Sequence, residues 1–213
     1  MEKHLYFFAV LCIAFFSNAQ NVPPPIDPSH PELDRVKLFV FVGEKIDVER
    51  IKTEEYSFDN LFTVKYKVIK ELYGHIQSDT LEFRVGDHYG VPVFTQFKNV
   101  LLYVSQNKDG KWYHQKYQYS DVYETIDGRW ATPGKDFEYW HEYNENPPFQ
   151  PEKIIFKEQI CIDISNIDNE VIETRVKPYY EVEGKKACAK MGNYVEELFE
   201  LKKTGVLHAR GLF

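Results

Sequence analysis

The sequence predicts a mostly β protein whose main unit is a small antiparallel barrel of five strands. Five segments between residues 36 and 119 are rich in β-branched and aromatic residues, and two of them alternate apolar with polar side chains. The connections between these segments are short and rich in turn-forming residues. Only the segment 193–207 shows the spacing of apolar residues that is typical of a helix.

The five predicted strands follow one another closely. Residues 36–49 are apolar on both parities as far as Phe41, which indicates a strand covered on both faces, and Gly43 indicates a bend at a barrel corner. Residues 61–74 and 79–86 alternate and therefore predict strands with one buried face. The last two strands are predicted at residues 99–106 and 111–119, joined by a turn at residues 107–110. This set fits a barrel of the oligonucleotide/oligosaccharide-binding (OB) type.

Beyond residue 150 the sequence predicts a β-hairpin and one helix. The hairpin strands are expected within residues 153–165 and 170–184. The helix is expected to begin at Asn193, which would form a capping box with Glu196, and to pack its apolar face against the barrel. The chain would thus consist of a signal peptide (1–19), a Pro-rich leader (20–35), an OB-like barrel with an aromatic excursion (36–149) and the hairpin and helix extension (150–213).

The first 19 residues have the composition of an export signal. Lys3 supplies a positive charge, twelve apolar residues follow, and Ser17 and Ala19 place small residues where a signal peptidase cleaves. Twelve apolar residues are too few for a membrane span, which takes about 20. The alternative is a buried N-terminal helix, which the Pro-rich sequence that follows disfavours. We therefore expect a chain that is exported to the periplasm or the cell exterior and begins near Gln20.

Two cysteines, Cys161 and Cys188, remain after the predicted signal. In an oxidising compartment two such cysteines most simply pair with each other. A reactive thiol is the alternative, but neither cysteine lies in a Cys-x-x-Cys motif or beside a histidine. The sequence therefore predicts a Cys161–Cys188 disulfide.

Three quoted segments, "VFVGEKIDVE", "FTVKYKVIKELYG" followed by "DTLEFRV", and "FKNVLLYVSQNKDGKWY", resemble the netrin-like module in their order and local pattern. That module is the OB barrel of the tissue inhibitors of metalloproteinases, and the resemblance covers about residues 36–119. It implies a barrel platform that presents loops to a partner. The N-terminal cysteine with which those inhibitors bind zinc has no counterpart after the predicted signal, so their zinc-binding mechanism is not expected here.

The motifs of catalysis, cofactor binding and nucleic-acid binding are missing from the sequence. "HEYNE" offers His141 and Glu145, but a zinc protease motif needs a second histidine, and we expect neither a metal nor a cofactor. No Gly-x-Ser-x-Gly is present for a nucleophilic serine. The formal net charge of −7 opposes binding to nucleic acid. The acids between residues 121 and 145 leave open a secreted hydrolase, since carboxylate pairs hydrolyse glycosides.

The region between Trp112 and Phe149 is the strongest functional signal. Eleven of its 38 residues are aromatic, against 16% in the whole chain, and it holds seven acids and three bases. Aromatic rings with polar tips are common at contact surfaces, although they also pack in half-buried positions under helices. We therefore expect an exported, non-catalytic binding protein whose partner is a protein or peptide, ahead of a glycan; a structural envelope protein is a further alternative. The predicted contact residues are Trp112, Tyr113, Tyr117, Trp130, Tyr139 and Trp140.

Overall fold

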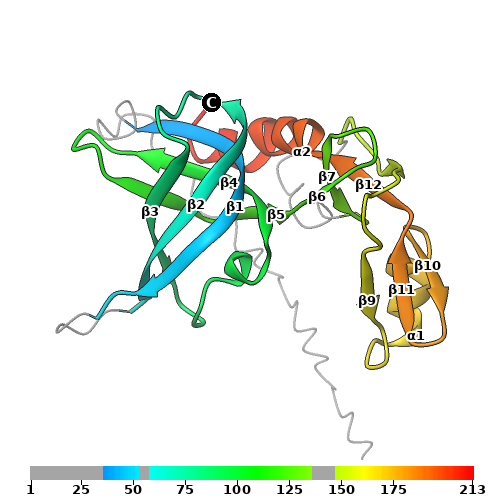
Figure 1. Cartoon of the computed structure of the whole chain (residues 1–213). Coiled ribbons are helices and arrows are strands. Elements are labelled where there is room, and N and C mark those ends of the chain that lie inside the picture. Colours follow the sequence, from blue (N-terminus) through cyan, green and yellow to red (C-terminus); the bar gives the residue numbers. More distant parts are fainter. Residues whose placement is uncertain (1–35, 53–57, 136–146) are drawn as a thin grey trace, which may run out of the picture.

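The computed structural model describes residues 36–52, 58–135 and 147–213, and its largest unit is a closed barrel of five strands (Figure 1). The strand order around the barrel is β1-β2-β3-β5-β4. The strands are β1 (Lys37–Arg50), β2 (Asn60–Tyr73), β3 (Thr80–Asp87), β4 (Asn99–Gln106) and β5 (Trp112–Asp121). The prediction of a mostly β chain with a five-stranded barrel is confirmed. The barrel is mixed rather than wholly antiparallel, because β3 and β5 run parallel and pair at Arg84 and Tyr113.

The strands differ in how many of their faces are buried. On β2 and β3 the side chains that point into the barrel, such as Val64 and Phe83, are buried, while their neighbours are more exposed. Both faces are buried on β4 and over residues 38–43 of β1, as the apolar residues on both parities as far as Phe41 predicted for β1. The second face is covered because Val40 and Tyr103 pack beneath the C-terminal helix.

A short 3-10 helix, η2 (Val93–Gln96), fills one end of the barrel between β3 and β4. Phe94 is 2% exposed and belongs to the barrel core. Its ring lies 6.1 Å from Tyr66 and 6.5 Å from Phe83, measured between ring centroids. The side chain of Phe94 therefore fixes the position of the connection between β3 and β4.

A second sheet joins the two halves of the chain. Its order is β6-β7-β12-β8, so strands from both sides of residue 149 pair with one another. Its strands are β6 (Tyr123–Glu124), β7 (Trp130–Pro133), β8 (Glu152–Lys153) and β12 (Met191–Tyr194). The described part of the predicted aromatic excursion after Val122 therefore belongs to this sheet and not to the barrel.

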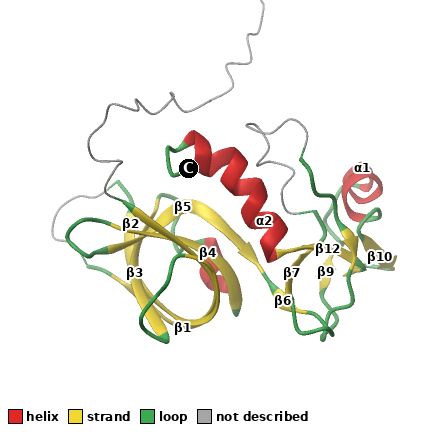
Figure 2. Ribbon diagram, turned by 90° about the horizontal axis from the view of Figure 1, so that it is seen from above, coloured by secondary structure: helices red, strands yellow, loops and turns green. Residues whose placement is uncertain are grey.

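A third, three-stranded sheet lies away from the barrel in both overall views (Figures 1 and 2). The predicted disulfide is confirmed, because Cys161 and Cys188 are direct partners on neighbouring strands, 4.0 Å apart between Cα atoms, and their sulfurs are bonded. The strands are β9 (Cys161–Asp163), β10 (Tyr180–Glu183) and β11 (Lys186–Ala189). The hairpin consists of β10 and β11, whereas the sequence predicted that the strand holding Cys161 would form it.

The prediction of a continuous strand over residues 170–184 is wrong in its first half. That half is helical, with α1 (Asn169–Val171) followed by the π-helical turn η4 (Ile172–Val176). The Asp168 side chain accepts a hydrogen bond from the Glu170 N–H and so caps the helix start. Ile172 and Val176 lie four residues apart, which places both against the third sheet in one small apolar cluster. The described part of the chain therefore has two short α-helices rather than one.

The C-terminal helix, α2 (Val195–Lys202), lies along the barrel (Figures 1 and 2) and continues into the turn η5 (Lys203–Leu207). Its predicted cap at Asn193 with Glu196 is wrong. Asn193 and Tyr194 pair with β7 as part of β12, so the helix begins after them. Glu197 provides the capping carboxylate instead and accepts a hydrogen bond from the Tyr194 N–H at 3.1 Å.

Candidate functional site

A large bulge interrupts β5 where it pairs with β4. Leu102 is opposite Tyr119 and Val104 is opposite His114, so one residue of β4 faces four residues of β5 between these pairs. Tyr117, at the tip of the bulge, has φ of 65°. A bulky residue in this left-handed region is uncommon, because its Cβ approaches the following carbonyl oxygen.

The bulge changes which way the rings of β5 point. Regular alternation predicted that Tyr113, Tyr117 and Tyr119 would line one face. Instead Tyr113 and Tyr117 are 38% and 48% exposed, while Tyr119 is partly buried against the barrel core. The Tyr119 ring lies 5.8 Å from Phe94, between ring centroids. The single row of rings is therefore split between the surface and the interior.

The C-terminal segment holds the bulge by three side-chain hydrogen bonds. Arg210 donates to Gln115 Oε1 at 3.2 Å and to the Lys116 carbonyl oxygen at 3.1 Å. The Lys202 ammonium, which is fully buried on α2, donates to Gln118 Oε1 at 2.7 Å. The conformation of the bulge thus depends on residues more than 80 positions away in the sequence.

A cavity of about 580 Å³ opens between this bulge and the loop that joins β3 to β4. Its walls are mainly apolar and aromatic. The Tyr117 ring forms part of one wall, and Tyr89 of the β3–β4 loop forms part of another. The full lining consists of Val85, Gly86, Asp87, Tyr89, Val91, Val93, Phe94, Gln96, His114, Tyr117 and Tyr119.

His114 supplies an uncharged aromatic ring to the wall of this cavity. Burial lowers the pKa of His114 to about 3, so its ring is neutral at physiological pH. Its Nε2 lies 3.0 Å from the Gln118 carbonyl oxygen, which requires the proton to be on Nε2. The ring packs 4.5 Å from Phe94, between ring centroids. His114 therefore extends the aromatic wall and adds no positive charge to it.

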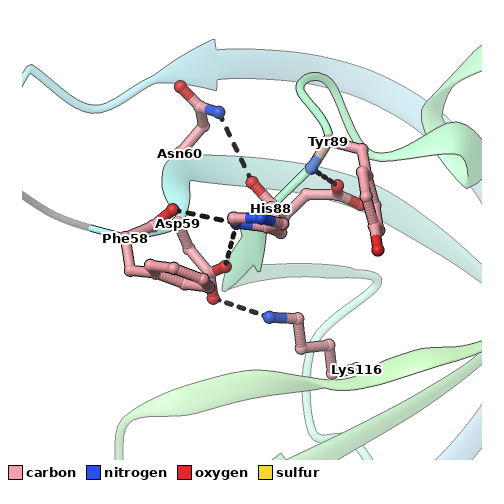
Figure 3. Close-up of polar contacts among 7 residues, drawn as sticks. Phe58, Asp59, Asn60, His88, Tyr89 and Lys116 are labelled. Atoms are coloured by element: carbon pink, nitrogen blue, oxygen red, sulfur yellow. Dashed lines mark hydrogen bonds and ion pairs between the residues drawn. The ribbon is translucent and has the colours of Figure 1, made fainter.

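Polar contacts at the rim tie the strand ends together (Figure 3). Asp59 Oδ2 accepts a hydrogen bond from the Lys116 ammonium at 2.7 Å, and this bond raises the pKa of Lys116. Beside this pair the His88 ring stacks on Phe58, with 4.1 Å between ring centroids. These contacts join the start of β2, the end of β3 and the bulge of β5.

Asp87 shapes the loop that forms the outer wall of the cavity. Its Oδ1 accepts a hydrogen bond from the Tyr89 N–H at 2.8 Å (Figure 3). After this turn Tyr89, Val91 and Val93 are 87%, 57% and 48% exposed, so three large apolar side chains of one short loop face outward. Such closely spaced exposed apolar residues are unusual unless another surface covers them.

A second hollow, of about 550 Å³, lies on the other side of Val91. Val91 lines both spaces, so they form one continuous surface across this end of the barrel. Ile46 is 51% exposed and lies in the second hollow. The complete lining of the second hollow is Lys45, Ile46, Asp47, Val48, Arg50, Phe62, Val91 and Thr95.

The six predicted contact residues are not brought together at one place. Trp112 packs against Phe39 with 4.6 Å between ring centroids, and Trp130 is partly buried against the cluster beneath α2. Tyr113 is exposed on β5, and Tyr117 lines the cavity. Tyr139 and Trp140 lie outside the described residues.

Sequence reasoning missed the β3–β4 loop as part of the site. Its segment "DHYGVPVF" places Tyr89, Val91 and Val93 beside Gly90 and Pro92, both turn formers. Apolar residues in a turn-forming segment cannot all be core residues of a strand or helix. The combination of large apolar residues with turn formers in one segment is therefore the sequence signal that could have identified this loop.

The described residues hold no group of three or more His, Cys, Asp or Glu side chains that could bind a metal ion. Across those same residues no helix is long and apolar enough to cross a membrane. No family model matches the sequence, and neither curated proteins nor solved structures gave a match to this chain. The resemblance to the netrin-like module thus stays a prediction.

Proposed function

We propose that this chain is an exported, non-catalytic binding protein, and that a polypeptide partner binds to the cavity and to the adjoining second hollow. The observation with the most weight is the backbone of Tyr117 at φ of 65°. A left-handed conformation costs an L-residue about 1–2 kcal/mol. Residues in such conformations cluster at ligand sites, where the surrounding structure holds them in place.

The hydrogen bonds from Arg210 and Lys202 are the structure that holds Tyr117 in this conformation. They fix the residues on either side of it, and the Tyr117 ring then forms a wall of the cavity. A rigid aromatic side chain that is positioned before binding loses little entropy when a partner arrives. The strained bulge therefore has the properties of a preorganised contact.

The size of the surface favours a polypeptide over a small molecule. A cavity of about 580 Å³ alone is large enough for a drug-sized ligand. However, the exposed apolar surface continues over Val91 into the second hollow of about 550 Å³. A chain that crosses Val91 from the cavity into the second hollow would also cover Ile46, which is 51% exposed and which a ligand confined to the cavity would leave exposed to water.

Export is supported by the disulfide between the two cysteines that follow the predicted signal. Disulfides persist in oxidising compartments and are rare in the cytosol. Mass spectrometry of the protein recovered from its native host should give a chain that begins near Gln20. Recovery of a chain that retains residues 1–19 would contradict export by signal cleavage.

Selection of random twelve-residue peptides displayed on phage tests the binding site. We expect enriched peptides to bind the full mature chain and to lose at least tenfold in affinity for a Val91→Lys variant, because the new ammonium lies between the two spaces of the proposed binding surface. Ile155→Lys is the matched control, since Ile155 is 67% exposed and lines neither space. The proposal would be contradicted if the enriched peptides bound the Val91 variant as tightly as the Ile155 variant, or if no peptide were enriched.

A further inference from the structure

We infer that the cavity accepts a basic side chain, lysine or arginine, of the partner polypeptide. This inference rests on the proposed function and specifies the group that occupies the cavity. It follows from three features of the described lining. These are the aromatic rings, the charged side chain of Asp87, and the Oδ2 atom of Asp87, which has no hydrogen-bond donor among the described residues.

Five of the eleven residues that line the cavity carry aromatic rings. Tyr89, Phe94, Tyr117 and Tyr119 all line the cavity, together with the neutral ring of His114. The face of an aromatic ring attracts cations electrostatically. The methylene groups of a lysine or arginine would at the same time pack against the valine side chains of the lining. A long basic side chain therefore matches both properties of the wall.

Among the residues that the structure describes, Asp87 is the only one with a charged side chain in the lining of the cavity. It is 8% exposed, and its Oδ1 already accepts the Tyr89 N–H. Within residues 36–52, 58–135 and 147–213, no hydrogen-bond donor contacts Asp87 Oδ2, and this atom is not sealed off from solvent. A basic side chain in the cavity would give Oδ2 a charge-assisted hydrogen bond.

The other charged groups near the rim do not reverse this preference. Lys116 lies 5.4 Å from the centroid of the Tyr117 ring, but its charge is offset by the hydrogen-bonded Asp59. The His88 ring contacts Asp59 and Phe58 at the rim and does not line the cavity. Asp87 contributes to the raised pKa of Lys116, but among the described residues it forms no salt bridge with a basic side chain.

The competing guests fit less well. An acidic side chain would face the Asp87 carboxylate at close range. A neutral apolar side chain would cover the rings, but it would also cut Asp87 off from water without supplying a donor, which costs free energy. Discrimination against both guests therefore follows from the same carboxylate.

Peptides of the sequence Ala-Leu-X-Leu-Ala-amide, with fluorescein coupled to the N-terminal amine so that the side chain of X stays free, test this inference with the full mature chain. X is lysine, arginine, norleucine or glutamate, and affinity is measured by fluorescence anisotropy. Norleucine keeps the methylene chain of lysine and lacks its charge. We expect the lysine and arginine peptides to bind about tenfold more tightly than the norleucine peptide, and the glutamate peptide to bind most weakly.

Asp87→Asn is the matched variant. Its amide oxygen can still accept the Tyr89 N–H, so the loop should keep its shape. The affinity for the lysine peptide should fall toward that for the norleucine peptide, and the norleucine peptide should bind no more weakly than to the wild-type chain, because a neutral amide costs less to bury than a carboxylate. A melting temperature within a few degrees of the wild-type value would show that the fold is retained.

The outcomes separate the two proposals. Equal affinity of the lysine and norleucine peptides for the wild-type chain would overturn the inference that a basic side chain occupies the cavity. The proposal of peptide binding would still stand. A lysine preference of undiminished size in Asp87→Asn would overturn the role of Asp87 as the partner of the basic side chain. Failure of all four peptides to bind, with Val91→Lys and the wild-type chain indistinguishable, would overturn peptide binding at this site as well.

Discussion

Tyr117 combines backbone strain with an exposed ring at a single residue. Its φ of 65° would suit glycine, yet the chain has a tyrosine there, 48% exposed, on the wall of a cavity. Stability alone gives no reason for this choice, because a smaller residue with a freer backbone would avoid the strain. A contact function gives a reason for the tyrosine, because glycine would relieve the strain but would remove the aromatic ring from the cavity wall.

Comparison of Tyr117→Gly with Tyr117→Ala measures the strain directly. Both variants lack the ring, but only alanine keeps the Cβ that makes φ of 65° unfavourable. We expect the glycine variant to have a free energy of unfolding about 1 kcal/mol higher than that of the alanine variant. Urea denaturation of both variants provides the measurement. An alanine variant as stable as the glycine variant would show that this backbone is not strained.

His114 should make the stability of the protein depend on acid pH. Its pKa is lowered to about 3 in the folded state, while an unfolded histidine titrates near 6.5. Between these values the unfolded chain binds more protons, so stability falls as pH decreases from 6.5 toward 3, by at most about 1.4 kcal/mol per pH unit. Above pH 6.5 the contribution is complete.

Denaturation of the wild-type chain and of His114→Gln between pH 7 and pH 4 tests this dependence. Glutamine does not titrate, and the other ionisable groups are common to both proteins. The difference in free energy of unfolding between the two should therefore shrink as the pH falls. A difference that stays constant over this range would mean that the folded protein protonates His114 as easily as the unfolded chain.

At the scale of elements, the strands with one exposed face were predictable and the bulge was not. Alternation located β2 and β3, because each has a core face and a solvent face. The bulge in β5 depends on Lys202 and Arg210, which are distant in sequence, so no local pattern in residues 112–121 could reveal it. The prediction that Asn193 caps α2 was wrong for a similar reason, because pairing with the distant strand β7 keeps Asn193 in a strand.

The contact between α2 and the bulge should support both stability and binding. Lys202→Met removes the hydrogen-bond donor to Oε1 of Gln118, a residue that is 8% exposed. Because a buried acceptor is then left without its donor, we expect the free energy of unfolding to fall by about 1–3 kcal/mol. Weaker peptide binding should follow, because Gln118 lies next to Tyr117 in the bulge.

Lys203→Met, at the first residue of η5 directly after α2, is the control. Lys203 forms a partly exposed ion pair with Glu200, three residues away, and such pairs contribute about 0.2–0.5 kcal/mol. Denaturant titrations and peptide affinities for the two variants give the comparison. Equal effects of the two substitutions on stability and affinity would contradict a special role for the buried lysine.

At the scale of the whole molecule, the proposed binding surface and the disulfide lie in different units. The binding surface is at one end of the barrel, and the Cys161–Cys188 bond links two strands of the separate three-stranded sheet (Figure 1). The composition and the two cysteines predicted the mostly β chain and the bond. They could not predict the position of the site, because that depends on which loops the closed barrel brings together.

Replacement of both Cys161 and Cys188 by alanine should therefore act locally. The chain-entropy effect of a loop of this length is about 3.5 kcal/mol. We expect faster hydrogen exchange in β9, β10 and β11, with exchange in the barrel and the affinity for peptides changed less than about twofold. Loss of peptide binding in this variant would mean that the third sheet contributes to the site.

Backbone resonance mapping with the lysine peptide is the most direct test of the proposed binding surface. In ¹⁵N-labelled mature chain, the largest shifts on titration should fall in residues 85–96 and 114–119, and Tyr117→Gly should abolish them. Largest shifts around Trp112 and Trp130, or in the second and third sheets, would place the contact elsewhere and contradict binding at the barrel end.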